Sequence, residues 1–385
     1  MKKRSIPLAW LQLIRQKGRF FVALSGIAFA DILMLMQLGF ESALYDSNTR
    51  LHQNLNADVV LISPQARNLA NMATFSRRRL FQAASLPEVE SATPLYVAFA
   101  DWKNPQTRSQ NAILLLGFDL EKPAFNLPEI NQNLGTLQQA DTLLFDRSSR
   151  GDYKQAIARI GQGETVSTEI KGRTIHLKGL FTVGSSFAAD GSLMTSDQNF
   201  LRIVSQRQAG EVSVGLITLA PNANPNAVVT ALKSRLPHDV RVLTRAEFIE
   251  FEEGYWRRNT AIGFIFALGT LMGFMVGVII VYQILYSDVS DHMAEYATLK
   301  AMGYRNLYLL GVVLQEALLL AVLGYIPGNL IAIGLYSLTR NATNLPIYMT
   351  LSRTIYVLLL TIIMCVMSGA VAVRKLRLAD PADIF

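Results

Sequence analysis

The sequence predicts an integral membrane protein with four transmembrane helices and a large α+β domain inserted between the first and the second. Two observations lead to this fold class. Of the 385 residues, 51% are hydrophobic and only 17% are charged, which is too apolar for an ordinary soluble protein and too polar for a chain made only of membrane spans. Four apolar segments are also long enough to cross the roughly 30 Å hydrocarbon core of a bilayer.

The first 19 residues predict the orientation of the chain. They form a basic, amphipathic segment without an acidic side chain, and their basic residues are Lys2, Lys3, Arg4, Arg15, Lys17 and Arg19. Cytoplasmic flanks of membrane helices are rich in Lys and Arg, so we expect this segment in the cytoplasm. Its charge indicates membrane orientation and not nucleic-acid binding.

The four predicted spans are residues 20–40, 261–286, 307–338 and 354–373. The first could instead be a signal peptide, since Ala28-Phe29-Ala30 has the A-x-A form. Its apolar run continues for ten residues beyond that point, which favours an uncleaved anchor. The third would be about 48 Å long at 1.5 Å per residue, and it contains Pro327-Gly328. Two half-length helices would each be too short to cross, so a single kinked or tilted helix is expected.

This orientation places each connecting segment on one side of the membrane. The loop 287–306 and the tail 374–385 are expected in the cytoplasm, together with the N-terminus. The domain 41–260 and the short loop 339–353 are expected on the outer side. The domain holds 23 basic and 22 acidic residues and is therefore nearly neutral.

The outer domain has mixed secondary-structure patterns. Residues 111–120 and 173–184 have the composition of strands. Residues 211–244 suggest a β-α-β unit, and the whole domain could comprise two lobes. The segments beside the membrane, 41–57 and 245–260, are predicted to be stalk helices, and the second could continue unbroken into the second span.

Motifs for catalysis and cofactor binding are absent from the sequence. There is no G-x-x-x-x-G-K-[ST] segment for ATP, no G-x-S-x-G elbow and no H-E-x-x-H. The four histidines, at 52, 176, 238 and 292, are scattered, and the single cysteine, Cys365, lies in an apolar segment. We therefore expect a non-catalytic chain that binds no cofactor and no metal itself.

Three polar residues fall inside the predicted spans: Asp31, Gln315 and Glu316. Ionisable groups in lipid are costly, so they usually face the interior of a helix bundle or a partner. Structural pairing or helix docking is one interpretation, and a proton relay is another. The scarcity of such groups is not typical of a wide hydrophilic channel.

Gly269, Gly273 and Gly277 recur at four-residue spacing in the second span. A ridge of small residues lets another helix approach closely. The neighbour could belong to the chain's own bundle or to a second copy across a dimer seam.

The loop 287–306 predicts a short amphipathic helix. Val289, Met293, Tyr296, Leu299 and Met302 fall on one face at helical spacing. Ser287 or Ser290 could cap its start, and Gly303 suits the position just past its end. Such a helix could lie on lipid, but its mixed charges favour docking into a protein groove.

This segment resembles the coupling helix of FtsX/MacB-type ABC permeases, whose motif is roughly R-x-x-E-I-x-x-L-K-A-x-G. EYATLKAMGYR (295–305) matches it at Glu295, Leu299, Lys300, Ala301 and Gly303, although Asp291-His292 replaces the usual upstream basic residue. The closing RKLRLADPADIF (374–385) is similar to the family's C-terminal signature at Pro381. One span, a large outer domain and three further spans is also the layout of this type VII permease fold.

Residues 6–40 and 187–203 resemble the cyanobacterial DevC-type permeases. This resemblance implies a homodimer, two copies of a DevA-like ATPase that holds ATP and Mg²⁺, a DevB-like membrane-fusion adaptor and a TolC-like outer-membrane duct. It further implies an inner-membrane location, contact with membrane lipids, a periplasmic domain, and export of an envelope lipid such as a glycolipid by mechanotransmission. The implied ATPase-coupling residues are Asp291, Met293, Glu295, Tyr296, Leu299, Lys300, Ala301, Met302 and Gly303. An FtsX-like regulator of a periplasmic hydrolase is the alternative within the family, and a membrane-anchored receptor without an ATPase is the alternative outside it.

Overall fold

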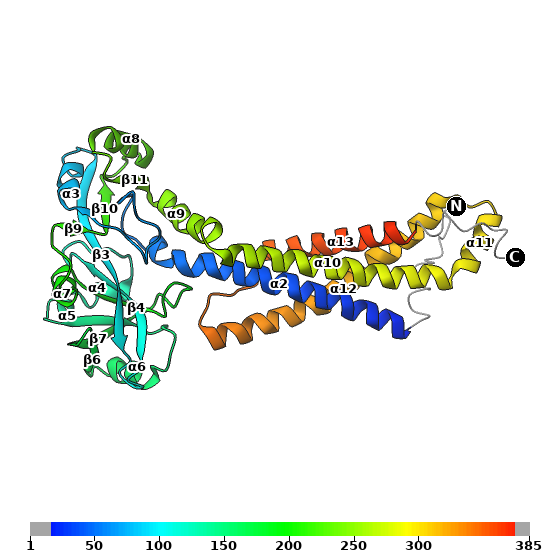
Figure 1. Ribbon diagram of the computed structural model, residues 1–385, viewed down its shortest axis with the longest axis horizontal. Coiled ribbons are helices and arrows are strands. Elements are labelled where there is room, and N and C mark those ends of the chain that lie inside the picture. Colours follow the sequence, from blue (N-terminus) through cyan, green and yellow to red (C-terminus); the bar gives the residue numbers. More distant parts are fainter. Residues whose placement is uncertain (1–16, 374–385) are drawn as a thin grey trace. The chain divides into compact units, whose positions relative to one another are not determined.

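The computed structural model describes residues 17–373, so the predictions for residues 1–16 and for the 374–385 tail with Pro381 lie outside the described residues. The chain divides into two compact units (Figure 1). Within the described residues, the helical unit comprises 17–42, 262–340 and 347–373, and the outer unit comprises 43–261 and 341–346.

The helical unit contains four helices that are long and apolar enough to cross a membrane, which confirms the predicted spans. The long helices are α2 (Lys17–Gln53), α10 (Ala261–Asp291), α12 (Asn306–Thr343) and α13 (Leu351–Ala372), and the short α11 (Met293–Ala301) joins α10 to α12. All four helices extend beyond the predicted spans, α13 only at its start, because helical hydrogen bonding continues into the more polar flanks. Pro327 lies inside α12, which remains one helix as expected.

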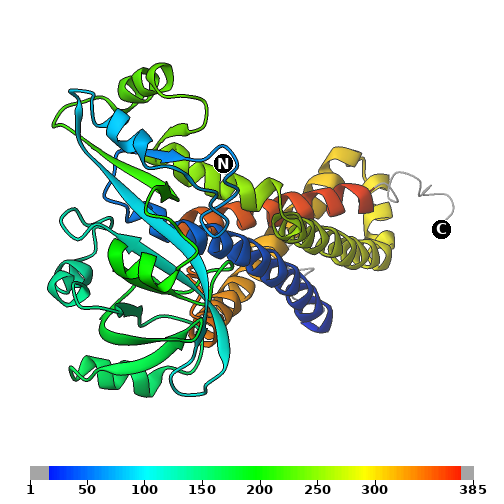
Figure 2. The same ribbon diagram turned by 60° about the vertical axis from the view of Figure 1, so that its left-hand side comes forward.

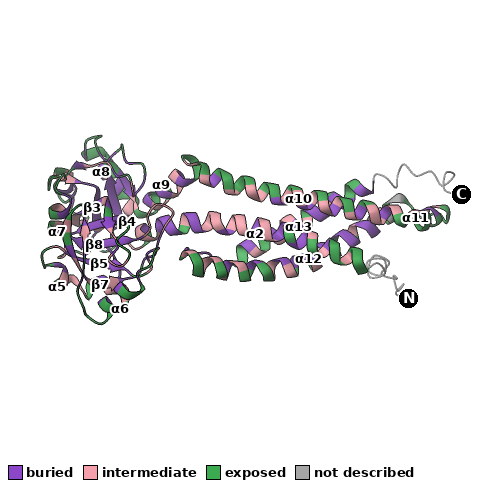
Figure 3. Cartoon of the chain, turned by 60° about the horizontal axis from the view of Figure 1, so that its bottom comes forward, coloured by how far each residue is buried: buried purple, intermediate pink, exposed green. Residues whose placement is uncertain are grey.

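Small and medium apolar residues fill the centre of the helical bundle. Ile27 of α2, Val281 of α10, Ala317 of α12 and Met364 of α13 are almost fully buried in one cluster. Large apolar side chains on the opposite side of α10, among them Leu271, are exposed (Figure 3). Apolar side chains both in the centre and on the outer surface are expected of helices whose outer faces contact lipid.

The outer unit is built on a nine-stranded sheet (Figure 2). The strands of the unit are β1 (Val59–Ile62), β2 (Phe75–Ser76), β3 (Val89–Lys103), β4 (Gln110–Phe118), β5 (Thr142–Asp146), β6 (Val166–Ile170), β7 (Arg173–Phe181), β8 (Ser192–Ser196), β9 (Glu211–Val212), β10 (Val214–Leu219) and β11 (Arg241–Thr244). The sheet order is β11-β1-β10-β3-β4-β8-β5-β7-β6, and β2 pairs separately with β9. The helices of the unit are α3 (Arg78–Ala83), α4 (Pro128–Asn131), α5 (Leu134–Leu137), α6 (Lys154–Gly161), α7 (Asp197–Ile203), α8 (Pro225–Arg235) and α9 (Arg245–Arg258).

The long strand β3 links the two halves of this sheet. It pairs with β10 on one side and with β4 on the other, and its end returns to β6 through Trp102 and Ile170. The strands predicted at 111–120 and 173–184 are β4 and β7. Because both halves share β3, one continuous sheet runs through the α+β domain.

Alternate residues of the central strands face two different cores. In β1, Val59 and Leu61 belong to one apolar cluster, whereas Val60 and Ile62 belong to the other. A strand buried on both faces has to be apolar at every position, as the sequence VVLI is. Helices and loops therefore cover both faces of the sheet.

The predicted β-α-β unit is present as β10, α8 and β11, but β1 lies between its two strands. Asn224 accepts a hydrogen bond from Asn226 N–H at the start of α8, and Pro225 occupies its first position. The stalk helix α9 does not continue into the second span, because it ends at Arg258 and α10 begins at Ala261. Thr260 Oγ1 donates to Trp256 O at 2.7 Å, a local bond that competes with the helical pattern.

Candidate functional site

The candidate site is the corner formed by the end of α10, the short helix α11 and the start of α12. The chain leaves α11 through a Schellman-type closure: Gly303 N–H donates to Lys300 O at 3.0 Å and Tyr304 N–H donates to Leu299 O at 3.1 Å. Gly303 has a φ of +92°, where a side chain would be strained. The predicted role of Gly303 as the residue just past the helix is therefore confirmed.

The start of α11 differs from the prediction. Neither Ser287 nor Ser290 caps it, because α10 continues to Asp291 and Ser290 Oγ donates within α10 to Tyr286 O. His292 occupies the N-cap position without a side-chain cap.

The inner face of α11 packs on the chain itself. Tyr296 is fully buried, Met293 and Leu299 are half-buried, and all three contact a cluster that includes Val289, Val313 and Val373. Three members of the predicted apolar face thus meet α10, α12 and the end of α13 and are not available for a partner. Met302 was predicted on the same face, and this prediction is wrong. Met302 is the C-cap residue of α11 and is 64% exposed, because it lies beyond Leu299, the last residue of α11 that packs on the cluster.

The outer face of α11 is exposed and mixed in character. Among the predicted coupling residues, Asp291, Glu295, Ala301, Met302 and Gly303 are exposed, and Lys300 is half-buried.

Exposed large apolar side chains follow directly after α11. Tyr304, Leu307 and Tyr308 are exposed near Met302, and the two tyrosine rings lie 4.8 Å apart. Sequence reasoning missed these residues, since Leu307 and Tyr308 were counted in a membrane span. An exposed group of large apolar residues beside a polar helix face is typical of a protein contact surface.

An ion pair connects this corner to the first membrane helix. Arg19 near the start of α2 forms an ion pair with Asp291 at the end of α10. The predicted coupling residue Asp291 is therefore already paired within the chain.

A cluster of buried polar residues lies where α10, the start of α11 and α12 come together. Glu316 of α12 is fully buried beside Asp288 of α10, and the His292 ring Nδ1 lies 3.5 Å from Asp288 Oδ1. Gln315 is exposed and points away from this cluster. Asp31 lies elsewhere in the bundle, where its carboxylate accepts a hydrogen bond from Thr361 Oγ1 at 2.5 Å. Among residues 17–373 no hydrogen bond connects Asp31 to Glu316, so the two carboxyl groups do not form one continuous network.

The glycine ridge of α10 packs against the chain's own helices. A Cβ atom at Gly269 would lie 2.5 Å from the Gln37 side chain, and one at Gly273 would lie 3.1 Å from Met34 Cγ. A Cβ atom at Gly277 would overlap Met364 of α13. A dimer seam at these three glycines is not compatible with this packing.

The stalk helices meet in the outer unit through a buried carboxylate that sequence reasoning also missed. Glu252 of α9 accepts hydrogen bonds from Leu69 N–H at 2.7 Å and from Trp256 Nε1 at 2.9 Å. His52, in the last turn of α2, places Nε2 3.5 Å from Glu252 Oε2 and is itself fully buried. We call His52, Glu252, Leu69 and Trp256 the stalk clamp.

Two more contacts fix the stalks. Arg50 donates to Val183 O at 2.7 Å, so the end of α2 is also tied to the loop after β7. A capping box between Thr244 and Glu247 fixes the start of α9. Both stalks are therefore held at residues close to the membrane helices in sequence.

The described residues offer no evident centre for chemistry. No group of three or more His, Cys, Asp or Glu side chains within residues 17–373 could hold a metal ion. The corner around α11 presents an exposed face on a short helix that is packed on the bundle.

Comparison with known proteins relates the helical unit to a permease family. Residues 264–381 match the model of the FtsX-like permease C-terminal domain. A search of curated proteins gave no match. The periplasmic region of MacB from Actinobacillus actinomycetemcomitans is similar at 10% identity and a TM-score of 0.35, over 53% of this chain and 94% of that one. The extracellular domain of the noncanonic ABC-type transporter YknZ from Gram-positive bacteria is similar at 12% identity and a TM-score of 0.33, over 49% of this chain and 100% of that one. The segment that contains helices α10 to α13 is thus similar to the FtsX-like permease C-terminal domain.

Proposed function

We propose that this chain is the permease subunit of a tripartite ABC exporter in the inner membrane. It works as a homodimer with its N- and C-termini in the cytoplasm and its outer unit in the periplasm. A separate DevA-like ATPase holds ATP and Mg²⁺, and a DevB-like adaptor leads from the outer unit to a TolC-like duct. The resemblance to DevC-type permeases favours a lipid-like envelope cargo, with a glycolipid as the candidate.

The corner around α11 is the observation that supports this proposal most strongly. Its inner face is anchored on the bundle by Tyr296, and its outer face presents Glu295 and Met302. A docking helix has to be packed on its own chain on one side and exposed on the other, and α11 has both properties. It is also joined directly to two membrane helices, so a push on α11 moves α10 and α12.

The stalks provide the path to the outer unit. Helix α2 is continuous from Lys17 to Gln53, so its rotation or translation reaches His52 without an intervening loop. Helix α9 contains Glu252 of the stalk clamp, and only two residues separate the end of α9 from the start of α10. Motion of the membrane helices would therefore reach the sheet through buried hydrogen bonds, which transmit displacement better than solvated loops do.

Copurification with the ATPase tests this function. Tagged wild type is compared with Met302→Asp, which changes an exposed apolar residue of the corner, and with Phe81→Asp, which makes the same kind of change at a 68% exposed residue of the outer unit. We expect an ATP-binding polypeptide to copurify with wild type and Phe81→Asp, and to be reduced at least about tenfold with Met302→Asp. Equal recovery with all three proteins, or no ATPase with any of them, would contradict the proposal.

A further inference from the structure

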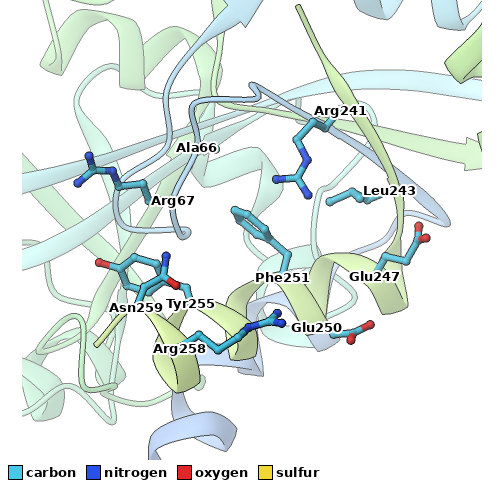
Figure 4. A pocket seen from close by; sticks show the side chains of 11 residues that line it. Ala66, Arg67, Arg241, Leu243, Glu247, Glu250, Phe251, Tyr255, Arg258 and Asn259 are labelled. Carbon is cyan, nitrogen blue, oxygen red and sulfur yellow. The ribbon is translucent and has the colours of Figure 1, made fainter. Parts of the chain in front are cut away.

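An open cavity of about 530 Å³ lies in the outer unit, between the loop after β1, the strand β11 and the helix α9 (Figure 4). Three arginines line it: Arg67 from the loop, Arg241 from β11 and Arg258 from the last turn of α9. Phe251 and Tyr255 lie among them. The cavity combines positive charge with aromatic surface, and the function proposed above does not use it.

The three guanidinium groups are not neutralised by carboxylates of the chain. Other arginines of this unit are paired, such as Arg79 with Asp239 and Arg173 with Asp141. Among the ion pairs of residues 17–373, none involves the three arginines of the cavity. Arg241 and Arg258 extend toward Phe251, whereas the Arg67 guanidinium lies at the rim and points outward (Figure 4). Exposed guanidinium groups that line one hollow without a carboxylate partner give a site for an anion.

Two glutamates also line the cavity, but they do not cancel this charge. Glu247 Oε2 accepts a hydrogen bond from Thr244 N–H at 2.7 Å in the capping box of α9. Glu247 and Glu250 lie along one edge, and their carboxylates point away from Phe251 (Figure 4). Arg241, Arg258 and the aromatic rings therefore surround the centre of the hollow, with Arg67 at its rim (Figure 4).

Two of the arginines are held in place before any ligand arrives. The Arg241 guanidinium lies 5.2 Å from the centre of the Phe251 ring, in a cation–π contact. Arg258 folds back over its own helix, where a Cβ atom at Gly254 would lie 2.7 Å from its Nη2. Gly254 thus leaves the room that the Arg258 guanidinium occupies. Preorganised donors bind more tightly because less side-chain freedom is lost.

The position of the cavity in the chain indicates the source of the anion. Arg258 and Asn259 line it, and the membrane helix α10 begins at Ala261. Tyr255 lines it too, and tyrosine is a residue type enriched at the level of lipid headgroups. We propose that this cavity, lined by Arg67, Arg241 and Arg258, binds the phosphate-bearing headgroup of an anionic phospholipid from the leaflet next to the outer unit.

The first measurement is binding of short-chain phosphatidylglycerol to the full-length protein in neutral detergent, with short-chain phosphatidylcholine and free glycerol phosphate as separate arms. We expect phosphatidylglycerol to bind at least about tenfold more tightly than either of the other two. It should also slow hydrogen–deuterium exchange of residues 241–259. Equal binding of free glycerol phosphate would overturn the lipid assignment, as would stronger binding of an acidic peptide at the same residues.

The variants localise the binding. Arg67→Gln, Arg241→Gln and Arg258→Gln should each weaken phosphatidylglycerol binding about tenfold, and the triple variant should reduce it to the level of phosphatidylcholine.

The matched control removes three exposed arginines elsewhere in the outer unit, Arg78→Gln, Arg147→Gln and Arg235→Gln, and should leave binding unchanged. Gly254→Ala keeps every charge and displaces only Arg258, so it should weaken binding severalfold. Equal binding by the two triple variants would overturn the proposal. None of these readouts depends on transport or on the ATPase, so they separate this proposal from the function proposed above.

Discussion

Replacement of Glu252 by alanine should loosen the stalk clamp. The carboxylate is 1% exposed and accepts two hydrogen bonds, from Leu69 N–H and from Trp256 Nε1. Its removal leaves two buried donors without an acceptor, each at a cost of about 1 to 3 kcal/mol, so the local loss of stability should be about 2 to 6 kcal/mol. Glu252→Gln keeps one acceptor oxygen and should lose about half as much.

Hydrogen–deuterium exchange of the detergent-solubilised full chain measures this loss. In Glu252→Ala, amides of residues 67–71 and 245–258 should exchange more than about tenfold faster than in wild type. Glu253→Ala is the matched control, because Glu253 forms only an exposed pair with Arg257 at 3.8 Å, worth about 0.5 kcal/mol or less. If the exchange rates of the two variants agreed within about twofold, the reasoning about the clamp would be refuted.

Three further predictions concern the two units. Burial raises the pKa of the Asp146 carboxyl above its ordinary 3.8, against the lowering effect of its hydrogen bonds from Ser148, Gly184 and Val183. The folded protein therefore holds this proton more tightly than the unfolded chain does, and raising the pH above about 3.8 should lower stability. The stability difference between wild type and Asp146→Asn should shrink as the pH rises in urea titrations, and a growing difference would contradict this. Gly303→Ala should destabilise the α11 corner by about 1 to 2 kcal/mol because of its positive φ, and unchanged exchange at residues 293–303 would count against it. Gly277→Leu should lower the thermal unfolding midpoint by overpacking against Met364, whereas the control Gly311→Ala, where a Cβ meets nothing within 4 Å, should not; equal midpoints would show that the ridge is not tightly packed.

The membrane helices could be predicted because their determinants are local. Long apolar runs leave few alternatives in lipid, and all four were located, including the single helix through Pro327. The helix around Tyr296 and its end at Gly303 were also predictable, since periodicity and a glycine just past the end act within a few residues.

The features that were missed depend on contacts between distant segments. His52 and Glu252 lie far apart in sequence, and neither has a motif that marks the other as its partner. The position of β1 between β10 and β11 likewise depends on pairing across the whole domain. Met302 fits the helical period, but it is the C-cap residue of the helix, where residues 301–305 are all exposed, so periodicity alone predicted a burial that the bundle does not provide.

The central claim is that the outer face of α11 contacts a separate ATPase. Site-specific photo-crosslinking in intact membranes tests it most directly, with the crosslinker placed at Thr298, which is exposed, or at Met293, which faces the bundle. The account predicts an adduct with an ATP-binding polypeptide from position 298, and only crosslinks within the chain from position 293. The absence of an ATPase adduct from position 298, or equal adducts from both positions, would contradict it.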